Sequence, residues 1–129
     1  EKGALLKDGY NRIAAEHDMS AYTLCIGYNC RSMVTFSPIA GNALELKTLM
    51  QQEMIKRGVL WAGFHNMCYS HTIEDIDYTL SAYADIMPIM KTAIESGNIQ
   101  QYLKGEVLEA VFRKVNNYNI KPKPLTVAE

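Results

Sequence analysis

The sequence lacks the compositional biases that mark fibrous, disordered and nucleic-acid-binding chains. Its 129 residues include only three cysteines, four prolines and eight glycines, and 13 basic residues nearly balance 14 acidic ones for a net charge of −1. Such a balance, with no basic block, provides no electrostatic footprint for nucleic acid or anionic lipid. Hydrophobic residues make up 48% and charged residues 21%, an ordinary globular composition that argues against disordered, collagen-like and coiled-coil classes.

Long hydrophobic runs are also missing. The longest, Val59 to Phe64, is far shorter than the roughly 20 residues that a membrane span requires, and the apolar stretch beside Lys2 and Lys7 is too short for a secretion signal. The cysteines, too few for a disulfide framework, are Cys25, Cys30 and Cys68. We therefore expect one cytoplasmic domain with reduced thiols. Because the chain begins at Glu1 inside an expected helix, we also expect the domain to come from a longer protein.

Periodicity in the first part of the chain predicts a helix followed by two strands. Apolar residues three and four positions apart predict a helix over residues 2–17, with His17 at its C-terminal end in a capping role. Two short β-prone runs follow, Tyr22–Tyr28 and Arg31–Phe36, separated by turn residues. In the second run one face carries Arg31, Met33 and Thr35, and the other carries Ser32, Val34 and Phe36.

The middle of the chain predicts a second helix and two short extended pieces. The helix is expected over residues 43–57, with Asn42 as its N-cap and Gly58 at its C-terminal stop. Residues 59–61 predict a short apolar strand, and residues 65–70 another extended piece.

The longest helix is expected after these strands. Apolar residues from Ile73 to Ile94 recur at helical spacing, and Gly97 ends the pattern. Thr72 and Asp75 have nearly the spacing and chemistry of a capping box. Pro88 predicts a kink or two abutting helices, because it removes a backbone hydrogen bond. Shorter elements are expected beyond it: a helix over 99–103, a helical stretch over 107–115 and an extended tail.

The order of these elements predicts an α+β fold, with a small, mostly antiparallel sheet and helices packed on one of its faces. We expect residues 1–116 to form the domain and residues 117–129 to form the tail. No internal repeat or low-complexity segment divides the chain further.

Few residues have the spacing of a chemical site. No phosphate-binding loop, dinucleotide fingerprint or nucleophile elbow occurs. One run combines metal-ligand types, His65-x-x-Cys68-x-x-His71. On a strand, His65 and Cys68 point to opposite faces, and His65 and His71 lie too far apart to share an ion easily, so packing and turn roles are favoured. Cys25 and Cys30 flank a turn and could pair, but free thiols are favoured.

Arg31 is the most informative polar residue. It heads a predicted strand, follows a turn and has no acidic neighbour in the sequence. A guanidinium so placed can clamp a carboxylate through two parallel hydrogen bonds, although a surface or ion-paired arginine is the more common outcome. From these residues alone no reaction can be named.

Four segments are distinctive as strings of residues. They are Arg31 to Ser37 (RSMVTFS), Leu46 to Gly58 (LKTLMQQEMIKRG), Val59 to Asn66 (VLWAGFHN) and Ser70 to Asp77 (SHTIEDID). Together they resemble the C-terminal region of class III pyridoxal-phosphate aminotransferases, and in particular the glutamate-1-semialdehyde 2,1-aminomutase-like branch. The resemblance extends from residue 1 to about residue 116, and the His-Thr-x-Glu-Asp-Ile motif at the start of the long helix is fairly specific.

The resemblance implies the small C-terminal domain of a fold-type-I aminotransferase, packed on a large cofactor-binding domain in a homodimeric enzyme. In that family the Schiff-base lysine, the aspartate beside the pyridine nitrogen and the phosphate-binding turn lie in the large domain. Pyridoxal 5′-phosphate is therefore expected in the parent enzyme and not on this chain alone. The resemblance also implies that Arg31, His65 and Asn66 contact an amino or oxo acid substrate. Asn29 and Cys30 stand where this branch commonly has Pro-Ser.

Two functions follow as hypotheses. In the first, which is favoured, the chain closes the substrate side of the active site of an aminotransferase or aminomutase and is not catalytic alone. In the second, it is a stand-alone, non-catalytic binding or assembly module with the same fold. Neither hypothesis includes a metal, nucleic acid or a membrane.

Overall fold

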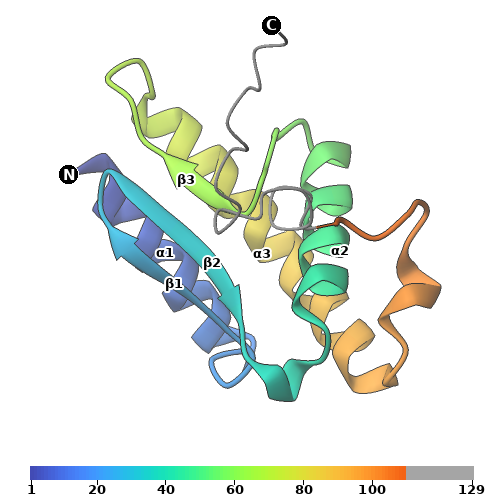
Figure 1. The fold of residues 1–129 in the computed structure, drawn as a ribbon. Coiled ribbons are helices and arrows are strands. Elements are labelled where there is room, and N and C mark those ends of the chain that lie inside the picture. The colour runs from blue at the N-terminus through green and yellow to red at the C-terminus, as the bar shows by residue number, and fades with distance from the viewer. Residues whose placement is uncertain (110–129) are drawn as a thin grey trace, which may run out of the picture.

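A computed structural model describes residues 1–109 of the chain (Figure 1). The expected tail over 117–129 and most of the helical stretch expected over 107–115 lie outside the described residues, and residues 107–109 are irregular. The longer elements are α1 (Lys2–Glu16), β1 (Thr23–Tyr28), β2 (Arg31–Phe36), α2 (Ala43–Lys56), β3 (Phe64–Asn66) and α3 (Ile73–Ser96). Short 3₁₀ helices occupy Pro38–Ala40 and Ile99–Tyr102.

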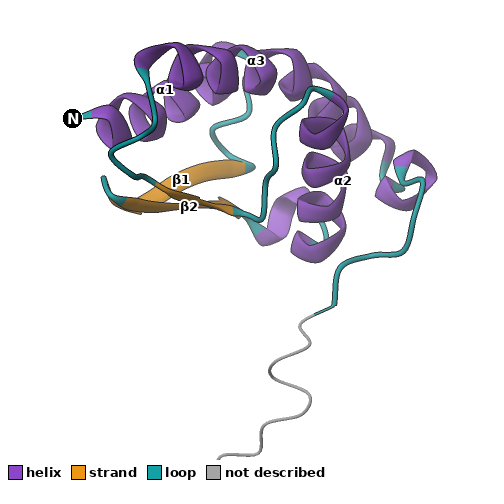
Figure 2. Ribbon diagram, turned by 90° about the horizontal axis from the view of Figure 1, so that it is seen from above, coloured by secondary structure: helices purple, strands orange, loops and turns teal. Residues whose placement is uncertain are grey.

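The predicted α+β class is confirmed. The strands form one three-stranded antiparallel sheet in the order β1-β2-β3, and α1 and α3 lie side by side on one of its faces (Figure 2). We call the helix-covered side the inner face and the opposite side the outer face. The inner face carries Thr23, Cys25, Ser32, Val34, Phe36 and His65, all of them buried. The outer face carries Leu24, Ile26, Tyr28, Arg31, Met33, Phe64 and Asn66, all of them exposed. Thr35 is half-buried on the outer face, and the alternation predicted for the second strand is thus confirmed.

The strand predicted over residues 59–61 is wrong, because this segment forms hydrogen bonds with α2 and α3 and not with a strand. Trp61 is buried, its indole N–H donates to Tyr83 Oη at 2.6 Å, and its carbonyl accepts from Gln51 Nε2 at 3.0 Å. The third strand begins at Phe64 instead. The extended piece predicted over 65–70 is also shorter than expected, because the chain turns after Met67, with His71 N–H donating to the Cys68 carbonyl at 3.3 Å.

Helix α3 begins and ends where the sequence predicts. Asp75 N–H donates to Thr72 Oγ1 at 3.1 Å and Thr72 N–H donates to Asp75 Oδ2 at 2.7 Å, which completes the capping box. Gly97 ends the helix in the left-handed conformation at φ 71°. The helix runs unbroken through Pro88, so the alternative of two abutting helices is wrong. Buried Met87 and Met90 on either side of the proline hold the helix in the core.

Two glycines allow α1 to lie unusually close to its neighbours. A Cβ at Gly3 would lie 1.6 Å from the Asn29 carbonyl oxygen in the β1–β2 turn, and a Cβ at Gly9 would lie 2.7 Å from both methyl carbons of Leu80 on α3. The helix therefore packs against both the hairpin and α3, at a cost in helix propensity of about 1 kcal/mol per glycine. Tyr10 and Tyr83 meet edge to face at this contact, with ring centroids 4.8 Å apart. No helix within residues 1–109 is long and apolar enough to cross a membrane.

Candidate functional site

His65 lies at the centre of a buried hydrogen-bond network that joins the sheet to α3. Its Nε2 atom lies 2.7 Å from Tyr83 Oη, and its Nδ1 atom lies 2.9 Å from Ser32 Oγ and 3.7 Å from Cys25 Sγ. The Trp61 indole N–H donates to the same Tyr83 oxygen at 2.6 Å. All five side chains are buried, so this network replaces the water that each polar group has lost.

The donors and acceptors of the network determine the protonation of His65. An indole N–H can only donate, so Tyr83 Oη accepts from Trp61. Because the buried hydroxyl hydrogen also needs an acceptor and His65 Nε2 lies 2.7 Å away, we assign Tyr83 as the donor to His65 Nε2. The remaining ring hydrogen is then on Nδ1 and points to Ser32 Oγ. Desolvation by burial lowers the pKa of His65 from 6.5 to about 4 and raises the pKa of Tyr83. The network is therefore neutral at physiological pH and presents no charge to a ligand.

Arg31 and Asn66 lie opposite each other in the β2–β3 pairing, and both are exposed on the outer face. The Arg31 guanidinium carbon lies 5.5 Å from the centre of the Phe64 ring, within cation–π distance. No ion pair to Arg31 occurs within residues 1–109. The structure thus brings together two of the three residues expected to contact a substrate, while His65, which precedes Asn66 on β3, points to the inner face.

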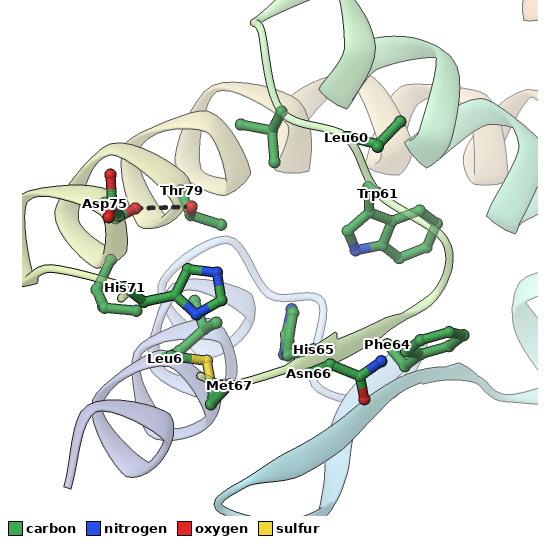
Figure 3. A pocket seen from close by; sticks show the side chains of 12 residues that line it. Leu6, Leu60, Trp61, Phe64, His65, Asn66, Met67, His71, Asp75 and Thr79 are labelled. Atoms are coloured by element: carbon green, nitrogen blue, oxygen red, sulfur yellow. Dashed lines mark hydrogen bonds between the residues drawn. The ribbon is translucent and has the colours of Figure 1, made fainter. Parts of the chain in front are cut away.

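A pocket of about 160 Å³ lies beside β3, between this strand, the loop over residues 59–63 and the first turns of α3 (Figure 3). His71 and Asp75 line one side and Trp61 the other (Figure 3). His65 and Asn66 also line it. The pocket is therefore the place where one ligand could contact both the buried network and the exposed residues of β3.

The His65, Cys68 and His71 run does not converge on one point. His65 is held within the buried network, whereas His71 Nδ1 accepts from the Cys68 N–H at 3.0 Å and lies 3.3 Å from Cys68 Sγ in the following turn. Within residues 1–109, no group of three or more histidine, cysteine or acidic side chains could hold a metal ion. All three cysteines are free: Cys25 is buried, and Cys30 and Cys68 are exposed.

The outer face of the sheet is apolar yet uncovered. Its exposed apolar side chains are Leu24 (49% exposed), Ile26 (43%), Tyr28 (83%), Met33 (45%) and Phe64 (39%). Figure 2 shows α1 and α3 on the opposite side of the strands and α2 beside the end of the sheet, so no labelled helix covers this face. Contiguous exposed apolar surface of this kind marks an interaction site or a binding groove.

Besides Cys25, which the sequence predicts only as a free thiol, three members of the buried network were not predicted as site residues: Ser32, Trp61 and Tyr83. A signal was present for two of them, because alternation places Ser32 among buried residues of its strand and helical spacing places Tyr83 in the apolar stripe of α3. A polar atom at such a position requires a buried partner. For Trp61 no such signal existed, since its segment was predicted to be a strand.

The chain matches no protein-family model, no curated protein and no solved structure.

Proposed function

We propose that this chain is the small domain of a pyridoxal-phosphate enzyme, an aminotransferase or aminomutase, and that it closes the substrate side of the active site. The observation that carries the proposal is the one-sided sheet. Five apolar side chains of its outer face, Phe64 among them, are at least 39% exposed, which fits a surface that packs on a second, larger domain. The order of helix, strand pair, helix, short strand and long helix is the order that the sequence resemblance implies.

In this proposal Arg31 binds the carboxylate of an amino or oxo acid. Its guanidinium is exposed on the outer face beside Asn66, and no described acidic side chain competes for it. A planar guanidinium donates two parallel hydrogen bonds to a carboxylate, and the Asn66 amide can add a third donor. His65 acts as a positioning residue, because its hydrogen bonds to Ser32 and Tyr83 hold β3, and hence Asn66, in place.

The cofactor is assigned to the large domain. A Schiff-base lysine works from an enclosed pocket that favours its neutral form, and no lysine within residues 1–109 is buried. Residues 1–109 therefore do not fit the cofactor, and its chemistry belongs to the other domain. The contribution of this chain is to bind the substrate carboxylate and to exclude water when the domains close.

The first test is the size of the native polypeptide and its cofactor content. An antibody raised against this domain should detect, in source-cell extract, a band several times larger than the 14.5 kDa of this chain. The immunopurified protein should carry the absorbance of bound pyridoxal phosphate. A band at 14.5 kDa, or a larger protein without the cofactor, would instead favour the stand-alone module.

The second test uses Arg31→Ala in that native protein. The substitution should raise KM for the amino or oxo acid by about tenfold or more, because a charge-assisted hydrogen bond contributes roughly 1.5–3 kcal/mol, and should leave the cofactor content unchanged. Arg12→Ala is the matched control, since Arg12 is an exposed arginine on α1 whose acidic partner is Glu16. Unchanged kinetics in Arg31→Ala would remove Arg31 from the substrate site.

A further inference from the structure

The two edges of the sheet differ in whether their backbone groups are occupied. At the β1 edge, the Asn11 amide oxygen accepts from the Cys25 N–H at 2.8 Å and its amide nitrogen donates to the Cys25 carbonyl at 3.0 Å. Lys7 Nζ donates to the Gly27 carbonyl at 3.1 Å. Side chains of α1 thus take the place of a neighbouring strand, which is a common way to prevent unwanted strand pairing.

The β3 edge has no such cover. Val34 N–H donates to the Gly63 carbonyl at 3.0 Å, and Met67 N–H donates to the Cys30 carbonyl at 2.9 Å. In an antiparallel ladder hydrogen-bonded pairs alternate, so His65 exchanges its backbone bonds with Ser32 on β2. The N–H and C=O groups of Phe64 and Asn66 therefore point away from the sheet, and no other residue within 1–109 bonds to them.

The pocket beside β3 lies against this open edge. A strand added next to β3 would place the residue opposite His65 with its side chain toward the inner side of the sheet, over α3. There the pocket offers about 160 Å³, lined by apolar Trp61 and Ile76 and also by polar His71, Asp75 and Thr79, and a cavity of about 150 Å³ has room for one benzene ring. The space therefore suits one aliphatic or aromatic side chain. Leu60, which is 94% exposed, is also among the residues that line the pocket.

Two cations lie near the Phe64 end of β3. The Arg31 guanidinium lies over the Phe64 ring, and Lys47 Cδ lies 4.0 Å from the Cβ position of Gly63. Neither forms an ion pair with an acidic side chain in the described part of the chain. Two cations without an acidic partner in the described part of the chain favour a segment that carries acidic residues.

We propose that the β3 edge binds an extended segment of a separate protein, in which an apolar residue enters the pocket and acidic residues flank it. The backbone groups of Phe64 and Asn66 supply the strand pairing, and the pocket supplies the selectivity. Residues opposite Phe64 and Asn66 have side chains on the outer side, where the Arg31 guanidinium lies over the Phe64 ring and can bind a carboxylate. The edge shares Arg31, Phe64 and Asn66 with the outer face used in the proposed function. The peptide titration of the isolated chain and the size-and-cofactor test of the native protein can nevertheless fail independently.

The test uses a short capped peptide with Glu-Leu-Glu at its centre, titrated into the full chain. Trp61 is the only tryptophan and lines the pocket, so its fluorescence should change saturably, with the dissociation constant confirmed by calorimetry. N-methylation of either glutamate amide, which faces β3, should weaken binding about tenfold or more, because it removes a hydrogen bond and blocks the approach of the strand. N-methylation of the leucine amide, which faces away, should have little effect.

A pair of matched protein variants tests the pocket. Thr79→Leu fills it and should weaken peptide binding about tenfold, whereas Thr92→Leu should not. Both threonines lie on α3 and donate to the carbonyl four residues earlier, but Thr92 is not among the residues lining the pocket. Equal loss in both variants, or no saturable binding of the peptide, overturns the proposal. A dimer that Thr79→Leu breaks and Thr92→Leu does not would assign the edge to a second copy, and so would also overturn it.

Discussion

The inner and outer faces of one small sheet show two different uses of the same strands. The inner face buries polar side chains and satisfies each of them, with Ser32, His65 and Tyr83 connected in one network. The outer face exposes apolar side chains such as Ile26 and Met33. For an isolated chain in water, apolar side chains are favoured at buried positions and polar side chains at exposed ones, which is the opposite of what these residues do.

The difference indicates which interactions maintain the fold and which are available for a partner. A buried, fully bonded polar network contributes specificity and is costly to disturb, because each orphaned group loses its only partner. An exposed apolar face contributes little to the stability of the isolated chain and becomes useful when something covers it. Substitutions on the two faces should therefore have very different effects on unfolding.

The largest effect is expected for Tyr83→Phe. The Tyr83 hydroxyl is the partner of both the Trp61 N–H and His65 Nε2, so its removal leaves two buried polar atoms without a partner. At about 1–3 kcal/mol for each, the free energy of unfolding should fall by about 4 kcal/mol, measured by urea denaturation followed through Trp61 fluorescence.

Tyr78→Phe is the matched control on the same helix. The Tyr78 hydroxyl donates to the Arg57 carbonyl, but the residue is 58% exposed, and water can replace the lost hydrogen bond. Its effect should stay below about 1 kcal/mol. Similar losses for Tyr83→Phe and Tyr78→Phe would mean that the buried network does not stabilise the fold.

Acid should weaken the inner face next most strongly. The pKa of His65 is about 4 in the folded chain and 6.5 when exposed, so between these pH values the unfolded chain binds more protons. Stability should therefore be at its full value above about pH 6.5 and fall by about 3 kcal/mol as the pH is lowered to 4. The lowered pKa of Glu53 and of Asp75 adds a further loss at and below their ordinary range.

The contribution of His65 can be isolated by two measurements. An NMR titration of its ring protons in the folded chain should give an apparent pKa near 4. Comparison of the unfolding free energy at several pH values in the native chain and in His65→Gln should show a flatter profile between pH 6.5 and 4 in the variant. The same slope in both would show that another group causes the acid sensitivity.

Much of the fold could be predicted from local patterns, whereas the site could not. Apolar spacing and the Thr72–Asp75 capping box located α3, and alternation gave both faces of β2. The strand predicted over residues 59–61 is wrong because Val59 and Trp61 are apolar for a different reason: they pack against the helices. The position of His65 inside the sheet depends on Tyr83, which lies 18 residues away, and no local pattern specifies that contact.

Two adjacent residues of β2 provide the sharpest comparison of the faces. Val34 is fully buried on the inner face, while Met33 is 45% exposed on the outer face. Val34→Ala should reduce the free energy of unfolding by about 2 kcal/mol through lost burial and a new cavity. Met33→Ala removes more atoms but should cost less than about 0.5 kcal/mol, as is usual at exposed positions. The reverse order would mean that the outer face is already packed.

The smallest effect is expected for Ile26→Thr. This substitution is informative because a large loss of stability would show that the outer face is covered. Both side chains are β-branched, so strand propensity is preserved, and Ile26 is 43% exposed on the outer face. The free energy of unfolding of the isolated chain should change by less than about 0.5 kcal/mol. A loss of 2 kcal/mol or more, at the level expected for a core residue, would show that this face is covered even in the isolated chain. A second domain could then not pack on it, and the observation that carries the proposed function would be removed.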